Sequence, residues 1–190
     1  MAEKDLVLTI VKLVDEMRKA GTPPTEQDLN RLAAQISNGF KAKKEEVAIL
    51  RLYPDARVLN FLFPIKLSKV GAIPLTTTHS LAAKTIREKR GEIVNNFPTY
   101  RHPTVFEAVD LSEDEKALPI QKIMSSPMIV EGKVIGVIQI SHKARPGEPF
   151  GPDFTQADLA QLATVGSILG KYLSELPAIS LIRPKSPAKA

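Results

Sequence analysis

The chain has 190 residues, which corresponds to one domain or to one domain with additional helices. Hydrophobic residues make up 43% and charged residues 25% of the chain, which excludes general disorder, a fibrous repeat and a coiled coil. The chain has no cysteine, which excludes disulfides, thiolate metal sites, a cysteine nucleophile and thioether attachment of a chromophore.

The net charge of +5 raises the question of a nucleic-acid partner. The lysines and arginines are spread along the chain among acidic residues and form no basic stripe with aromatics, so no nucleic-acid partner is expected. No apolar run approaches the ~20 residues that span a bilayer, and no secretory signal is visible. We therefore expect a cytoplasmic protein without a membrane partner.

The first predicted helix, residues 4–20, carries two adjacent apolar stripes. Such a wide apolar face is more than one sheet face covers, and it predicts a homodimer held by this helix and by the last helix. Residues 1–22 are accordingly expected to form a dimerisation helix, residues 23–176 the domain, and residues 177–190 a disordered basic tail. The stripes consist of Leu6, Ile10, Leu13 and Met17, and of Val7, Val11 and Val14.

A second helix is expected to begin at a capping box of Thr25 and Asp28 and to end at Asn38-Gly39. Two runs of mostly apolar residues, 46–53 and 57–64, then predict a β-hairpin with Leu59, Phe61 and Phe63 on one face of the sheet.

Less regular sequence follows the first hairpin. We expect a loop over residues 65–79, a helix over 80–90 closed by Gly91, a short strand at 92–96 and an irregular segment at 97–125.

A second hairpin is predicted for residues 127–130 and 134–141. Gly136 in its second strand indicates close approach of another backbone, most simply a helix that crosses the sheet. The last helix, residues 155–175, is capped by Thr155 and Asp158, and Pro177 ends it. This order of elements predicts an α+β fold with a central antiparallel sheet and helices on its faces.

The sequence contains no phosphate-binding glycine motif, no metal-ligand spacing and no nucleophile elbow, so catalysis is not indicated. The long loops at 73–80 and 95–106 instead mix polar and aromatic groups, which is typical of a small-molecule pocket. Its polar groups are expected to be Thr76, Thr78, His79, Tyr100, Arg101 and His102, and its apolar wall Phe61, Phe97 and Met124.

A structural role is the alternative for each of these residues. Thr78 and Ser80 would then cap the helix, Phe97 and Tyr100 would fill the edge of the core, and Arg101 would pair with Glu107 or Asp110. If Arg101 lies in the pocket, its guanidinium favours a carboxylate or phosphate ligand.

Several segments in order resemble a GAF domain over about residues 25–175. The resemblance implies a six-stranded antiparallel sheet with the terminal helices on one face and a pocket closed by short helices and loops on the other, a profilin-like sandwich. Members are mostly sensory or regulatory modules, and many dimerise through terminal helices. The matching segments are 48–59 (AILRLYPDARVL), 73–75 (IPL), 80–89 (SLAAKTIREK), 126–140 (SPMIVEGKVIGVIQI) and 154–163 (FTQADLAQLA).

Known activities of the family fit this chain unevenly. Covalent bilin binding and the family's free methionine sulfoxide reductases need cysteines, which are absent. The cyclic-nucleotide subgroup carries an Asn-Lys pair followed by Phe-x-x-x-Asp-Glu. Here Lys143, Phe154 and Asp158 match that pattern, whereas His142 and Leu159 replace the Asn and the Glu. The cap of the last helix already accounts for Phe154 and Asp158.

We therefore expect a non-enzymatic signal-transduction module that senses a small molecule. The sequence identifies neither the ligand nor a cofactor. Because no output domain follows Pro177, the signal would pass through a dimer or a separate output protein. Two alternatives stay open: an interaction module whose vestigial pocket is filled by its own side chains, and an enzyme that uses His79 or His102 with Arg101.

Overall fold

The computed structural model describes residues 3–68, 71–99, 118–145 and 147–177, which form one six-stranded antiparallel sheet with helices on both faces. The strand order is β3-β2-β1-β6-β5-β4, and every neighbouring pair is antiparallel. The fold class expected from the sequence is therefore confirmed. The strands are β1 (Val47–Tyr53), β2 (Val58–Phe63), β3 (Ala72–Pro74), β4 (Glu92–Val94), β5 (Ile120–Val130) and β6 (Lys133–Lys143).

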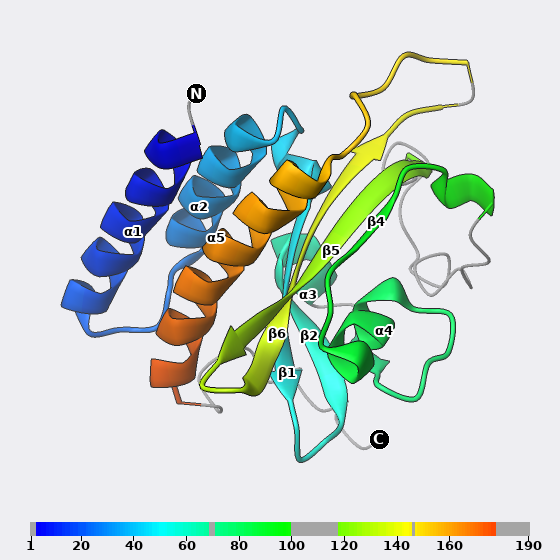
Figure 1. Ribbon diagram of the computed structural model, residues 1–190. Helices are drawn as coiled ribbons and strands as arrows, with labels where there is room; N and C mark the ends of the chain where they lie inside the picture. The colour runs from blue at the N-terminus through cyan, green and yellow to red at the C-terminus, as the bar shows by residue number, and fades with distance from the viewer. Residues whose placement is uncertain (1–2, 69–70, 100–117, 146, 178–190) are drawn as a thin grey trace, which may run out of the picture.

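One face of the sheet is covered by two layers of helix. The helices α2 (Glu26–Gly39) and α5 (Gln156–Glu175) contact the strands, and α1 (Glu3–Ala20) lies outside them in contact with both (Figure 1). Two glycines of α5, Gly166 and Gly170, let this helix approach Met128 on β5 closely. The main hydrophobic core lies between these helices and the sheet.

The wide apolar face of α1 is mostly covered within the same chain. Five residues of the two predicted stripes are buried against the rest of the main core, namely Leu6, Ile10, Leu13, Val14 and Met17. Val7 is half-buried, and the side chains that reach solvent are Leu8 and Val11. The surplus of apolar surface that suggested a dimer is thus smaller than the sequence indicated, and the dimer stays a prediction.

The opposite face is covered by the short helix α4 (Leu81–Glu88), which contacts β5 and β6 (Figure 1). The four-residue helix α3 (Ile65–Ser68) contacts β2. A smaller apolar cluster fills this layer, made of Leu50, Leu59, Phe61, Ile73, Ala82, Ala83, Ile86 and Val137. The two faces therefore differ in the number of helices and in the size of the core beneath them.

The predicted helix starts are confirmed in atomic detail. In both α2 and α5 the N-cap threonine accepts a hydrogen bond from the third amide of the helix, and the carboxylate of that third residue, an aspartate, accepts one from the backbone amide of the cap. At α5, the Asp158 amide donates to Thr155 Oγ1 over 3.2 Å, and the Thr155 amide donates to Asp158 Oδ2 over 2.7 Å. Ser80 caps α4 by accepting from the amide of Ala83, as the alternative role of that serine proposed.

A β-bulge in β2 overturns the prediction that Leu59, Phe61 and Phe63 share one face. Ile49 and Leu50 of β1 are adjacent, yet they pair with Phe63 and Phe61, so Leu62 is an extra residue in β2. An extra residue turns the following side chain to the other face. Phe61 consequently packs under α4, whereas Phe63 packs in the main core.

Gly136 is approached closely by a backbone, but by a strand and not by the helix that we expected. A Cβ atom placed on Gly136 would lie 2.1 Å from the carbonyl oxygen of Leu50 on β1 and 2.6 Å from the terminal methyl of Met128 on β5. The glycine is therefore required by the pairing of three central strands.

Three other elements differ from those predicted from the sequence. Strand β5 begins at Ile120, inside the segment predicted to be irregular, because β6 and β4 pair with it on either side. The predicted loop at 65–79 contains α3 and β3. Helix α4 ends at Glu88, and its C-cap residue Lys89 adopts a left-handed conformation (φ 51°), before Gly91.

Candidate functional site

The three apolar residues of the predicted pocket do not lie together. Phe61 is buried under α4, and Phe97 is buried in a separate small cluster with Leu81 and Ile123. Met124 packs in the main core, on the other face of the sheet. Because Phe61 and Met124 lie on opposite faces, they cannot line the same cavity, and this part of the prediction is wrong.

The polar residues of the predicted pocket fall into two groups. The side chains of Thr76, Thr78 and His79 are exposed on the segment between β3 and α4. Tyr100, Arg101 and His102 lie outside the described residues, as do the alternative partners of Arg101, which are Glu107 and Asp110. The ligand-binding role of these residues stays a prediction.

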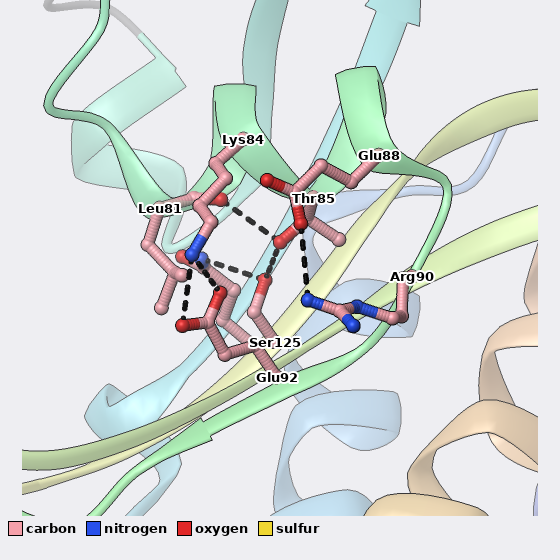
Figure 2. A network of polar contacts seen from close by, with 8 residues as sticks. Leu81, Lys84, Thr85, Glu88, Arg90, Glu92 and Ser125 are labelled. Carbon is pink, nitrogen blue, oxygen red and sulfur yellow. Dashed lines mark hydrogen bonds and ion pairs between the residues drawn. The ribbon is translucent and has the colours of Figure 1, made fainter.

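A chain of buried hydrogen bonds lies between α4 and the sheet (Figure 2). The hydroxyls of Thr85 on α4 and Ser125 on β5 are 2.7 Å apart. Thr85 Oγ1 donates to the carbonyl of Leu81 over 2.8 Å, so the proton between the two hydroxyls comes from Ser125. Ser125 Oγ in turn accepts from the side-chain amide of Gln139 on β6 over 3.0 Å. Both hydroxyls of this hydrogen-bond network therefore have partners, as buried polar groups require.

Ion pairs and hydrogen bonds hold the rim of this layer. The ammonium of Lys84 on α4 lies 2.7 Å from the carboxylate of Glu92 on β4 (Figure 2). Arg87 donates to the carbonyls of Leu75 and Thr77 over 2.8 and 3.1 Å, which ties the segment after β3 to α4. Helix α4 is thus attached at both sides.

Sequence reasoning missed the residues of this polar layer. The available signal was that Ser125 and Gln139 interrupt strands that are otherwise mostly apolar. Both positions face α4, where the partner Thr85 becomes recognisable only after the chain has folded.

A hollow of about 240 Å³ lies at the end of the sheet where β1 begins and β6 ends. Its wall comes from the segment after α2, from the end of β6 and from the loop before α5. The residues that line it are Lys41, Lys43, Glu46, His142, Lys143, Pro149, Phe150 and Gly151. None of them belongs to the pocket that the sequence predicted.

Glu46 links the start of β1 to the end of β6 at this hollow. Its carboxylate accepts the backbone amide of Lys43 over 2.7 Å and that of Lys143 over 2.6 Å, and it lies 3.8 Å from Nδ1 of His142. Burial opposes ionisation of the carboxyl, but His142 and the two amides outweigh it and hold the pKa of Glu46 below its ordinary value.

The imidazole of His142 is packed on both sides. It stacks on the ring of Phe154 with the ring centres 4.5 Å apart and an angle of 10° between the planes. A Cβ atom on Gly151 would lie 2.4 Å from Nε2, so only glycine fits there. Nε2 is buried and has no hydrogen-bond partner among the described residues.

These layers and this topology define an α+β sandwich, and comparisons with known proteins place it in a family. A family model described as GAF domain matches residues 25–174. The chain belongs to the GAF domain family, as the resemblance implied. No curated protein sequence matches the chain.

Several solved structures share the fold at low sequence identity. The GAF domain of an Acinetobacter phosphoenolpyruvate-protein phosphotransferase has 15% identity and a TM-score of 0.65, covering 92% of this chain and 96% of its own. The corresponding domain from Coxiella burnetii has 14% identity and a TM-score of 0.60, with 89% and 93% coverage. A free methionine-R-sulfoxide reductase from Neisseria meningitidis, in complex with its substrate, has 15% identity, a TM-score of 0.59 and coverage of 90% and 88%.

The part of the chain that the structure describes contains neither a membrane-spanning helix nor a metal-binding cluster. No helix among them has the length and apolar character that a membrane crossing requires. Within the same residues, no group of three or more His, Asp or Glu side chains is arranged to hold a metal ion.

Proposed function

We propose that this GAF domain is a non-enzymatic regulatory module that binds a small polar molecule between α4 and the sheet. The buried chain of Thr85, Ser125 and Gln139 carries this proposal. Hydrogen bonds between buried side chains add little net stability over apolar groups of the same shape, so their presence in an apolar layer suggests another role. A ligand with hydroxyl or amide groups, in contrast, can exchange hydrogen bonds with all three.

The approach to this layer supports the same proposal. The exposed polar groups of Thr76, Thr78 and His79 precede α4, and Arg87 links the carbonyls of that segment to the helix. A ligand that displaces the segment would therefore move α4, and α4 contacts β5 and β6. This connection gives a route from ligand binding to a change at the sheet.

The proposal that the module is not an enzyme rests on chemistry that the chain lacks. Without cysteine, it has no thiol for the reduction that the family's methionine sulfoxide reductases carry out. An enzyme based on His79 or His102 with Arg101 is the weaker candidate, because His79 is exposed on the segment before α4.

The interaction module with a self-filled pocket is the second candidate. It is favoured by the complete hydrogen bonding of Thr85 and Ser125 and by the packing of Phe61 and Ile86 in the same layer. In an interaction module, the hydrogen bonds of Thr85, Ser125 and Gln139 would only fix the position of α4.

Native mass spectrometry of the purified protein separates the two candidates. The regulatory module should retain a molecule of defined mass, which Ser125→Ala and Gln139→Ala should release. The control is Ser167→Ala, since Ser167 is exposed on α5 and bonds only to its own helix. A wild-type protein of the bare chain mass, with an unfolding temperature unchanged by a library of polar metabolites, would favour the interaction module.

Signal transfer through a homodimer of α1 and α5 is part of this proposal. Its support is the exposed apolar surface of Leu8 and Val11 on α1. A separate output protein is the other recipient of the signal, and it would use the same surface in place of a second copy.

A further inference from the structure

The hollow at the β1 and β6 end of the sheet has an excess of positive charge. Lys41, Lys43 and Lys143 line it, and none of these ammonium groups forms an ion pair among the described residues. The acidic side chain in the wall, Glu46, already accepts two backbone amides. The negative charge of Glu46 is therefore already engaged by these two backbone amides.

Backbone hydrogen bonds hold the segments that carry these lysines. Glu46 holds the amides of Lys43 and Lys143, so both residues are attached to one carboxylate. Lys41 adopts a left-handed conformation with φ 53°, which is uncommon for a residue with a side chain, and the next amide, of Ala42, donates to Ser37 at the end of α2.

Lys143 shows that the charge in this region is not fully compensated. Its side chain is half-buried and donates to the carbonyl of Glu45 over 3.0 Å. Burial lowers the pKa of Lys143, and the nearby positive charge of Lys66 on α3 lowers it further, against the opposing effect of Glu46 and Glu45. An anion in the hollow would stabilise the charged form.

The buried imidazole in the wall is a second, independent feature. The side chain of His142 is only 3% exposed, and Nε2 has no partner among the described residues. Leaving a buried polar nitrogen without a hydrogen bond costs free energy. Gly151, which lies against Nε2, also lines the hollow, so an anion bound there would lie beside this unpartnered nitrogen.

We propose that this hollow is a second binding site, distinct from the layer under α4, for a small multiply charged anion of the phosphate class. Lysine ammonium groups bind phosphate as point charges and can approach its oxygens from several sides. The volume of about 240 Å³ lies below the range of about 300–1,000 Å³ typical of drug-sized ligands, so the anion is small. The exposed ring of Phe150 at the rim, with the Lys122 ammonium 4.8 Å from its centre, adds an apolar wall for an attached organic group.

Titration calorimetry with sodium pyrophosphate at constant low ionic strength tests the site. The variant Lys41→Gln/Lys43→Gln removes two exposed charges from the hollow, whereas Lys12→Gln/Lys133→Gln removes two exposed charges from α1 and from the start of β6. We expect the first variant to bind pyrophosphate at least tenfold more weakly than the wild type and the second to stay within twofold. Equal weakening in both variants, or no binding by the wild type, would overturn the proposal.

Two further measurements locate the anion and identify its source. In NMR spectra, pyrophosphate should shift the side-chain resonances of His142 and leave those of the exposed His79 unchanged; the reverse pattern would place the anion elsewhere. Binding to vesicles with 25% phosphatidylserine, without binding to pyrophosphate, would replace the free anion by a lipid surface. Because these assays neither change nor observe Thr85, Ser125 or Gln139, their outcome does not depend on the function proposed for α4.

Discussion

The two faces of the sheet are built from different chemistry. On the face of α2 and α5, a large and almost wholly apolar core includes Leu162 and Met128, both completely buried. On the face of α4, a smaller apolar cluster surrounds the hydrogen-bonded Thr85 and Ser125. This contrast suggests that the first face provides most of the stability, while the second can exchange its internal contacts for those of a ligand.

The largest effect should come from the apolar face. Leu162→Ala removes a fully buried side chain from the centre of α5 and should lower the free energy of unfolding by about 2–5 kcal/mol, because the cavity cannot close completely. Urea denaturation measures this loss. For comparison, Leu8→Ala, at an exposed position of α1, should change the free energy of unfolding by less than about 0.5 kcal/mol. A smaller effect of Leu162→Ala than of Ser125→Ala would reverse the assignment of the two faces.

Gly136→Leu tests the three central strands that the two faces share. The added side chain would meet the carbonyl of Leu50, which belongs to the backbone and cannot rotate away. We expect a loss of about 1–3 kcal/mol or more, with a lower unfolding temperature by calorimetry. Leucine in place of Ala163, which is exposed on α5, serves as the control. An unchanged unfolding temperature in Gly136→Leu would mean that the strand pairing is looser than described.

Glu46 extends the comparison to the end of the sheet. Its pKa is lowered in the folded protein, so its contribution to stability is complete above the unfolded pKa of about 4.3 and is lost as the pH falls through the folded pKa. Glu46→Gln should cost about 1.5–3 kcal/mol at pH 7, since one charged acceptor of two amides is removed. The difference between wild type and variant should shrink below pH 4. A difference that stays constant across this pH range would contradict the linkage.

Two neighbouring serines give the sharpest comparison of the faces. Ser125→Ala leaves the amide of Gln139 without its acceptor and should cost about 1 kcal/mol. Ser126 is also buried, but it pairs with Ile138 on the side of the main core, and its side chain forms no hydrogen bond with the described residues. Ser126→Ala should therefore be neutral or stabilising in urea denaturation. Equal losses in both variants would show that the polar layer under α4 has no special role.

The smallest effect on stability is expected from Leu8→Glu, although it tests the proposed dimer directly. Leu8 is 58% exposed, so a charge there should change the free energy of unfolding of the monomer by less than about 0.5 kcal/mol. Light scattering at micromolar concentration should show two chains for the wild type and one for the variant. Wild-type protein of monomeric mass would rule out the dimer and leave a separate partner as the recipient of the signal.

Much of the fold was predictable because its signals are local. The caps at Thr25 and Thr155 join residues three positions apart, and both appear as expected. The turn of the second hairpin, Glu131-Gly132, places two residues at positive φ (49° and 76°), which suits a two-residue hairpin turn. The order of these elements, matched to the GAF family, was sufficient to predict the six-stranded sheet and the faces that its terminal helices cover.

The candidate sites were less predictable because they join distant parts of the chain. The opposite faces of Phe61 and Met124 follow from the register of β2 on β1, of β1 on β6 and of β6 on β5, which becomes visible only when these strands are paired. Composition grouped those two side chains in one pocket, since it records residue types and not the face on which each one lies.

The sequence by itself determined the longer helices, the two hairpins and the family of this protein, because hydrophobic periodicity and capping act over a few residues. Tertiary structure alone decided which polar groups meet. Thr85 and Ser125 are 40 positions apart, and the amide of Lys143 reaches Glu46 across 97 positions. No local pattern encodes such pairs, since each forms only when the packing of α4 and the register of β1 against β6 have brought the partners within hydrogen-bond distance.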